Sequence, residues 1–257
     1  MAEEYDDRMV AMLELIWGRG FLAPGGPAYV REHLRGLDLA DRTLLDVGSG
    51  LGGGALVIAG DLGARVVGLD IEPALIERAR RYAEAARLVE RIDYRLVRPG
   101  PFPLPDGAVD VVYASGAFTQ IADKEALFAE CFRVLRPGGH LAVYDWMTHD
   151  GPASEAMEEF YRLEGLTYAI RSLEAHGLLL RQAGFVDVVL EDCSDWYRRE
   201  ARSEWERMKG PLYPVMVERL GQGGADHFVE NWQAMVAVLD LGELRPGRYR
   251  ARRPVER

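Results

Sequence analysis

LLDVGSGLGGGALVIAGDLGARVVGLD, residues 44–70, is the stretch that decides the fold. Two apolar runs flank a segment that holds seven glycines, and the runs carry Asp46 and Asp70 at their ends. Glycines let the backbone approach a bound group closely, and a helix that follows such a loop offers free N–H groups. The stretch therefore predicts a strand, a ligand-binding turn, a helix and a second strand.

The same alternation continues along the chain. It predicts a doubly wound, Rossmann-like α/β fold with a mostly parallel, seven-stranded sheet. The expected strands are 43–47, 65–69, 92–97, 109–114, 139–145, 185–192 and 247–253, with helices near 53–62, 73–89 and 123–135.

We treat residues 1–257 as one domain with three parts. Residues 1–36 are an N-terminal helical lid, 43–146 are the cofactor-binding core, and 150–245 are a helical cap interleaved with the last strands. Arginines crowd the final strand, and we interpret them as the solvated face of an edge strand.

Composition and charge limit the classes of partner and cofactor that the chain is expected to bind. The net charge of −10 argues against nucleic acid as the main partner, because a protein that neutralises many phosphates is usually basic. No apolar run approaches 20 residues and no signal peptide is recognisable, so we expect a cytoplasmic protein without membrane partners. Two cysteines without metal-site spacing predict no metal centre. A small-molecule substrate fits best, and a monomer or a homodimer is expected.

The aspartates decide between ligands for the glycine loop. Gly48-x-Gly50-x-x-Gly53 has the spacing of a dinucleotide loop, which is a weak signal alone. A carboxylate at Asp46 would repel a pyrophosphate and suit an ammonium group, and Asp70 stands where a carboxylate reaches ribose hydroxyls. S-adenosylmethionine carries both an ammonium group and an adenosine ribose. A nicotinamide-dependent dehydrogenase is the alternative, and Asp46 argues against it.

Four ordered motifs support that cofactor: LLDVGSGLGGG, VVGLDIEP, PLPDGAVDVVYASGAF and FRVLRPGGHLAVYDW. With them the chain resembles class I S-adenosylmethionine-dependent methyltransferases, which release S-adenosylhomocysteine. The resemblance implies that the glycine loop holds the methionine end, and that Asp70 and Ile71 hold ribose and adenine. The implied cofactor residues are Asp46, Gly48, Ser49, Gly50, Gly53, Asp70, Ile71, Arg98, Pro99 and Ser115.

The N-terminal YDDRMVAMLELIWGRGFLAPGG makes the chain most similar to the phosphoethanolamine N-methyltransferase group. That resemblance implies a catalytic pair at Tyr5 and Gln120, although the group has histidine at the second position. Arginine and tyrosine of its phosphate site are replaced by Gly165 and Thr167, and no lysine stands near Gln233. We therefore expect another small acceptor, held by aromatic and apolar walls. The candidate substrate residues are Leu13, Phe21, Trp146, His149, Tyr161 and Trp196.

The chemistry at Gln120 leaves alternatives open. An amide cannot act as a base at neutral pH, so positioning must drive the transfer, and nitrogen is favoured over oxygen or carbon as the acceptor atom. His149 could replace the missing base or meet Asp145, and it could equally lie in a surface loop. A fold recruited for rearrangement or cyclisation, with the cofactor as a structural ligand, is one alternative. A non-catalytic binding protein is another.

Overall fold

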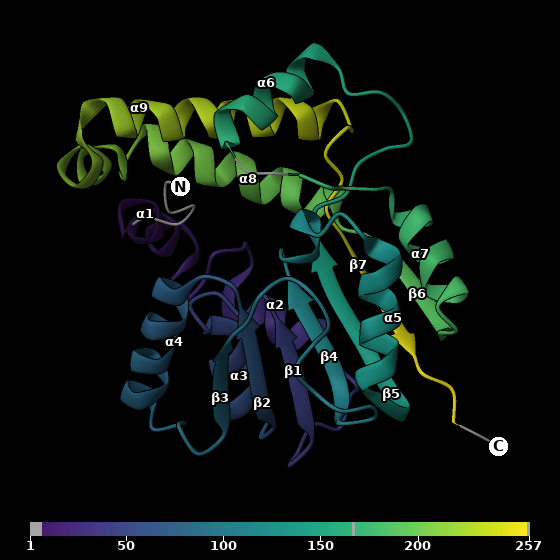
Figure 1. The fold of residues 1–257 in the computed structure, drawn as a ribbon. Coiled ribbons are helices and arrows are strands. Elements are labelled where there is room, and N and C mark those ends of the chain that lie inside the picture. The colour runs from purple at the N-terminus through teal and green to yellow at the C-terminus, as the bar shows by residue number, and fades with distance from the viewer. Residues whose placement is uncertain (1–6, 166–167, 256–257) are drawn as a thin grey trace.

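The computed structural model describes residues 7–165 and 168–255, and its centre is a seven-stranded sheet (Figure 1). The strand order is β3-β2-β1-β4-β5-β7-β6, with β7 antiparallel to both neighbours and the other paired strands parallel. This confirms the Rossmann-like fold. The strands are β1 (Thr43–Val47), β2 (Arg65–Asp70), β3 (Ile92–Leu96), β4 (Val109–Ser115), β5 (Leu135–Asp145), β6 (Val186–Asp192) and β7 (Gly247–Arg252).

The expectation that the arginine-rich last strand lies at an edge is wrong. β7 lies between β5 and β6, and β6 is the edge. The arginines find partners on both sides: Arg248 pairs with Glu191 of β6, and Arg250 donates to the carbonyl of Arg35. The error arose because charged side chains on a strand can face neighbouring carboxylates and helix ends as well as solvent.

Helices cover both faces of the sheet. α2 (Gly26–His33), α3 (Gly53–Gly60) and α4 (Pro73–Ala86) pack on one face, in a core that includes Val30, Ile58 and Ala79. α5 (Lys124–Val134) and α7 (Leu173–Gln182) pack on the other through Phe128 and Leu180. Figure 1 shows this doubly wound arrangement, in which the carboxyl ends of the parallel strands converge below the cap.

The cap is a helical layer over those carboxyl ends (Figure 1). It comprises α6 (Glu155–Glu164), α8 (Ser194–Lys209) and α9 (Tyr213–Asp240), and α9 is kinked at Gly221, whose φ is 75°. Its interior, which we call the cap cluster, is rich in aromatic and methionine side chains. The cap cluster includes Met12, Leu13, Trp17, Leu22, Trp146, Phe160, Tyr161, Tyr168, Trp196, Tyr197 and Trp232.

Helix α1 (Asp7–Trp17) joins the cap to the core. The Glu14 carboxylate accepts hydrogen bonds from the backbone of Gly20 at 2.7 Å and from the Tyr82 hydroxyl of α4 at 2.8 Å. The Trp17 indole donates to Glu204 of α8 at 2.8 Å. α1 is thus docked on both parts in this structure.

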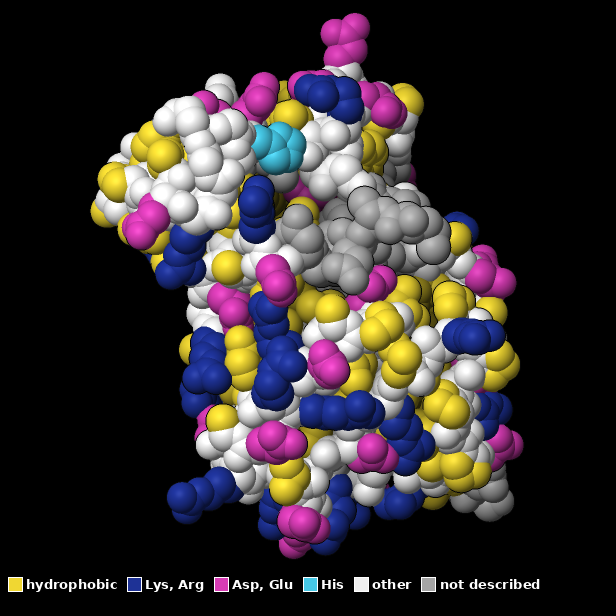
Figure 2. All heavy atoms as spheres, turned by 60° about the vertical axis from the view of Figure 1, so that its left-hand side comes forward, with side chains coloured by type: hydrophobic (Ala, Val, Ile, Leu, Met, Phe, Trp, Pro, Cys, Tyr) yellow, Lys and Arg dark blue, Asp and Glu magenta, His cyan; other side chains and the backbone are white. Residues whose placement is uncertain are grey.

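The surface carries both signs of charge. On the face in Figure 2, Lys and Arg side chains are interspersed with Asp and Glu. Ion pairs such as Arg81–Glu77 and Arg91–Asp41 match this pattern. Within the described residues, no helix has the length and apolarity needed to cross a membrane.

Candidate active site

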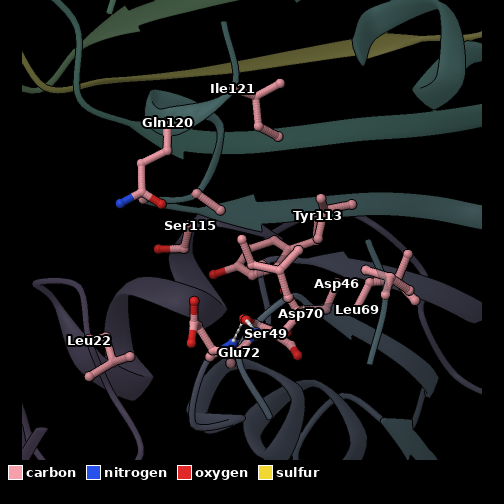
Figure 3. A pocket seen from close by; sticks show the side chains of 18 of the residues that line it. Leu22, Asp46, Ser49, Leu69, Asp70, Glu72, Tyr113, Ser115, Gln120 and Ile121 are labelled. Carbon is pink, nitrogen blue, oxygen red and sulfur yellow. Dashed lines mark hydrogen bonds between the residues drawn. The ribbon is translucent and has the colours of Figure 1, made fainter. Parts of the chain in front are cut away.

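A cavity of about 820 Å³ opens where β1, β2 and β4 end (Figure 3). Two parts of its wall differ. The Gln120 wall consists of the loop after α1 and the turn after β4, and the Arg98 wall consists of the loop after β3 and the start of α5. The Gln120 wall includes Phe21, Leu22, Ala23, Pro24, Tyr29, Ser115, Gly116, Ala117 and Gln120. The Arg98 wall includes Val97, Arg98, Pro99, Phe102, Ala122, Asp123, Ala126 and Glu130.

The glycine loop forms the floor, and close approaches explain its composition. Gly48 has a φ of 70°, and a Cβ there would lie 2.3 Å from the Cβ of Ala117. Gly53 begins α3, and a Cβ there would lie 2.4 Å from the carbonyl oxygen of Gly20. Any side chain at either position would push a cavity wall away. The glycines therefore bring the floor into contact with both the turn after β4, at Ala117, and the loop after α1, at Gly20.

Asp70 is held in a fixed orientation at the end of β2. One carboxylate oxygen accepts from the backbone N–H of Gly50 at 2.7 Å, and the other accepts from that of Glu72 at 2.9 Å. Burial raises the pKa of Asp70, and the backbone hydrogen bonds oppose that rise. Each carboxylate oxygen retains a lone pair for a further donor. The geometry suits a diol whose hydroxyls donate to both oxygens.

Asp46 is more deeply buried, with 3% of its surface exposed, and it lines the same floor. Burial, and secondarily the charge of Asp70, raises its pKa to about 7. Burial also raises the pKa of the Tyr94 and Tyr113 hydroxyls, with Asp46 as the next cause. An ammonium group above this floor would restore the ionised carboxylate, because an opposite charge favours the charged form.

Ser49 gives an independent indication of a ligand. Its hydroxyl is buried, lines the cavity, and has no hydrogen-bond partner within the described residues. A buried hydroxyl without a partner costs free energy, so a polar group in the cavity would satisfy it. Asp70 is oriented to accept hydrogen bonds from a diol, Asp46 suits an ammonium group, and Ser49 awaits a polar partner. These three features fit the ribose and the methionine end of S-adenosylmethionine. Those residues would hold it.

Gln120 ends a short 3₁₀ turn, η1 (Phe118–Gln120), that other elements fix in place. The fully buried Lys124 ammonium donates to the carbonyl of Phe118 at 2.6 Å and to that of Ile121. The carbonyl of Thr119 accepts from the backbone of Ala169 at 2.8 Å. The side chains of Gln120 and Ser115 reach the same side of the cavity (Figure 3). The turn is therefore a supported platform for the amide.

The structure brings the expected cofactor residues together. Gln120 and Phe21 also line the cavity, whereas Tyr5 lies outside the described residues. All ten expected cofactor residues contribute to the wall or floor: Asp46, Gly48, Ser49, Gly50, Gly53, Asp70, Ile71, Arg98, Pro99 and Ser115.

The expected acceptor residues mostly lie deeper. Leu13, Trp146, Tyr161 and Trp196 belong to the cap cluster, and Leu22 is the residue that belongs to both cap cluster and cavity wall. Trp196 stacks on the Tyr29 ring, with centroids 4.6 Å apart, so it backs the Gln120 wall rather than forming it.

His149 lies away from the cavity lining, next to Thr148, with 3.5 Å between its Nδ1 and the Thr148 hydroxyl oxygen. Asp145 is fully buried and accepts from the backbone N–H of Trp146 at 2.9 Å. Within the described residues no hydrogen bond or ion pair joins His149 to Asp145. His149 is therefore not part of the cavity wall described above.

The cavity residues that sequence reasoning missed include Leu22, Tyr29, Glu72 and Tyr113. Glu72 follows the motif around Asp70, and its position next to a cofactor carboxylate was a usable signal. Tyr113 lies on β4 among buried residues, where strand alternation alone does not separate cavity from core. Tyr29 and Leu22 reach the cavity through tertiary packing of the N-terminal segment.

The chain is similar to known methyltransferases. Residues 45–143 match the family described as "Methyltransferase domain". The chain is 29% identical over 247 residues to phosphoethanolamine N-methyltransferase of Triticum aestivum, covering 96% of this chain and 48% of that protein. It is 31% identical to a sterol 24-C-methyltransferase of Aspergillus fumigatus, covering 89% and 67%. The chain spans about half the length of the phosphoethanolamine N-methyltransferases of Triticum aestivum and Zea mays that it matches.

A solved structure shares the fold almost throughout. Phosphoethanolamine N-methyltransferase 2 of Haemonchus contortus, in complex with phosphomonomethylethanolamine and S-adenosylhomocysteine, superposes with a TM-score of 0.91 at 23% identity. The match covers 98% of this chain and 59% of that one. With the cavity floor described above, these similarities place the chain in the class I S-adenosylmethionine-dependent methyltransferases.

Proposed function

We propose that this chain transfers a methyl group from S-adenosylmethionine to a nitrogen atom of a small-molecule acceptor. The observation that carries the proposal is Gln120, a neutral amide on a fixed turn beside the cofactor floor. Among the described residues, the Gln120 wall carries no histidine, lysine, aspartate or glutamate, and a neutral amine is a nucleophile that needs no base. The phosphoethanolamine N-methyltransferases among the relatives support nitrogen as the acceptor atom.

The cofactor supplies an electrophilic methyl group on a sulfonium. In the proposal Asp70 accepts hydrogen bonds from the ribose hydroxyls, and Asp46 and Ser49 receive the polar methionine end. Gln120 orients the acceptor nitrogen in line with the methyl group. Positioning of this kind can contribute about 7–11 kcal/mol without acid–base catalysis. The amine loses its ammonium proton to water before attack.

The domain organisation follows from this assignment. Residues 43–146 bind the cofactor, residues 150–245 supply the cap, and residues 1–36 cover the cavity. Tyr5 is proposed to close the site with Gln120. Leu13, Trp146, Tyr161 and Trp196 shape the acceptor side through the cap cluster, and Phe21 contacts the acceptor at the wall.

The test is product analysis. Purified protein is incubated with methyl-labelled S-adenosylmethionine and matched amines and phenols, and mass spectrometry follows S-adenosylhomocysteine and the labelled product. Labelled N-methyl product is expected, and Gln120→Ala should lower its rate while cofactor affinity changes little. Methylation of phenols without any amine product would contradict the proposal. Conversion of an acceptor without release of S-adenosylhomocysteine would point to the rearrangement alternative.

A further inference from the structure

The charged groups of the cavity are unevenly distributed in sign. Among the cavity-lining residues in the described parts of the chain, Arg98 is the single lysine or arginine. The carboxylates that line the cavity are Asp46, Asp70, Glu72, Asp123 and Glu130, and of these Glu130 is neutralised by an ion pair with Arg133 at 2.8 Å. Because carboxylates in a concave, low-dielectric site focus their field into it, a bound group meets a predominantly negative potential.

The Gln120 wall adds no cation to this balance. Arg98 belongs to the opposite wall, on the loop after β3. The Gln120 wall presents apolar side chains together with the hydroxyls of Ser115 and Tyr29 and the Gln120 amide, and no lysine or arginine of residues 7–165 and 168–255 lines it. Figure 3 shows the Glu72 carboxylate pointing into the cavity between Ser115 and Leu22.

The cap behind this wall also carries buried carboxylates. Glu204 accepts from the indoles of Trp17 and Trp232, at 2.8 Å and 3.1 Å, and Glu164 accepts from the Asn231 amide at 2.7 Å. Burial raises the pKa of both glutamates. In the part of the chain that the structure describes, neither forms an ion pair with lysine, arginine or histidine. Among the described residues, these two glutamates therefore bring no paired lysine or arginine that could balance an anionic substituent on the acceptor.

Methyl transfer to a neutral amine involves a positive charge throughout, which suits a negative potential in the cavity. When a neutral amine attacks, the N–CH₃ bond forms, the S–CH₃ bond breaks with its electron pair going to sulfur, and the positive charge passes from sulfur to nitrogen. The site therefore holds one positive charge at the reacting centre before and after transfer. A phenolate would instead be destabilised near these carboxylates, because like charges raise the cost of the anion.

We infer that the acceptor is an amine that bears no phosphate, carboxylate or other anionic group, and that the cavity carboxylates, Glu72 among them, select it by charge. The inference rests on the proposed N-methyl transfer and adds the substrate class. It excludes amino acids and phosphorylated amines as good acceptors.

Calorimetry on the protein saturated with S-adenosylhomocysteine tests the inference through binding alone. The probes are trimethyl(2-phenylethyl)ammonium, which mimics a methylated amine product, and 2-phenylethyl phosphate, which has the same aryl body with an anionic head. The ammonium probe should bind at least about tenfold more tightly, as expected from electrostatic focusing. Equal affinities, tighter binding of the phosphate, or no binding of the ammonium at millimolar concentration would overturn the inference.

A matched pair of variants assigns the preference to the cavity. Glu72→Gln removes a cavity carboxylate whose side chain does not cap α4. Glu77→Gln makes the same change on the same helix, at a side chain that is 76% exposed and pairs with Arg81. The preference should shrink about threefold or more in Glu72→Gln and stay unchanged in Glu77→Gln. An equal change in both variants would overturn the role of Glu72.

Two further measurements distinguish a failure of charge selection from a failure of the proposed N-methyl transfer. Turnover of N-methylphenylalanine as fast as N-methyl-2-phenylethylamine would overturn the charge selection while N-methyl transfer stands. Phenol methylation without amine methylation would overturn both.

Discussion

The cavity floor and the cap cluster hold their buried carboxylates in different ways. On the floor, Asp70 is fixed by backbone N–H groups of Gly50 and Glu72. In the cap, Glu204 is fixed by side chains from three helices: Trp17 of α1, Tyr197 of α8 and Trp232 of α9. A backbone-built site tolerates changes in most neighbouring side chains, whereas a side-chain-built cluster changes with each substitution. The floor can therefore keep one cofactor while the cap adapts to different acceptors.

Asp70→Ala should produce the largest effect, and it should fall mainly on affinity, because water in the cavity can reach the backbone N–H groups of Gly50 and Glu72 that lose their acceptor. In the proposed assignment, the change removes two charge-assisted hydrogen bonds to the ribose of the cofactor, each contributing about 1.5–3 kcal/mol. We expect S-adenosylhomocysteine to bind roughly 100-fold more weakly by calorimetry, with a small change in unfolding free energy. Unchanged affinity would show that the floor does not hold the ribose.

Glu204→Ala should show the opposite pattern. It leaves two indole N–H groups without an acceptor and leaves the Tyr197 hydroxyl with the Met235 sulfur, at a cost of about 2–3 kcal/mol in unfolding free energy. Chemical denaturation measures that loss, and S-adenosylhomocysteine affinity of the folded protein should stay within a few-fold. Glu200→Ala, at an exposed position on the same helix, is the control. A large loss of cofactor affinity in Glu204→Ala would break the separation between the two regions.

Asp46 makes cofactor affinity depend on pH. Its pKa is raised to about 7 in the free protein, so the ionised form that suits an ammonium group is lost as the pH falls below that value. S-adenosylmethionine affinity should fall by up to about tenfold per pH unit below 7. It should also fall above about pH 8 as the ligand amino group, with a usual pKa of about 7.7–8.0, loses its proton.

The control for that profile is Asp46→Asn. This variant should bind more weakly at neutral pH and lose the acidic limb of the curve in calorimetry. Retention of the acidic limb would assign it to another group, and Asp70, whose pKa is also raised, would then be the first candidate.

The docking of α1 gives the smallest effect. Tyr82→Phe removes the hydroxyl that donates to Glu14 and should cost about 1 kcal/mol of local stability. Hydrogen exchange should show faster opening of residues 8–17 in the variant, with unchanged S-adenosylhomocysteine affinity. Comparing the wild type with and without S-adenosylhomocysteine separates two behaviours. Slow exchange only with ligand identifies a lid, and equal protection in both states identifies a permanently docked helix.

The contrast between floor and cap also explains what the sequence could predict. Strand alternation and the spacing of Gly48, Gly50 and Gly53 define the floor locally, so every expected cofactor residue reached the cavity. The acceptor residues depend on how distant helices pack. Leu13 and Trp146 share a cluster because α1 packs on α9 and Trp146 packs on Tyr197 of α8, and no local pattern encodes these contacts. The interior place of β7 was missed for the same reason, since strand order is a long-range property.

The central claim is methyl transfer to nitrogen without a catalytic base, and tyramine tests it most directly. Tyramine carries an amine and a phenol and no anionic group. The nitrogen and the phenol oxygen therefore compete for the methyl group within a single molecule. After incubation with methyl-labelled S-adenosylmethionine, tandem mass spectrometry locates the label. The account predicts N-methyltyramine together with S-adenosylhomocysteine. Predominant label on the phenol oxygen would contradict it, because that product would require a base, a role that the neutral Gln120 amide cannot fill and the Glu72 carboxylate would then have to fill.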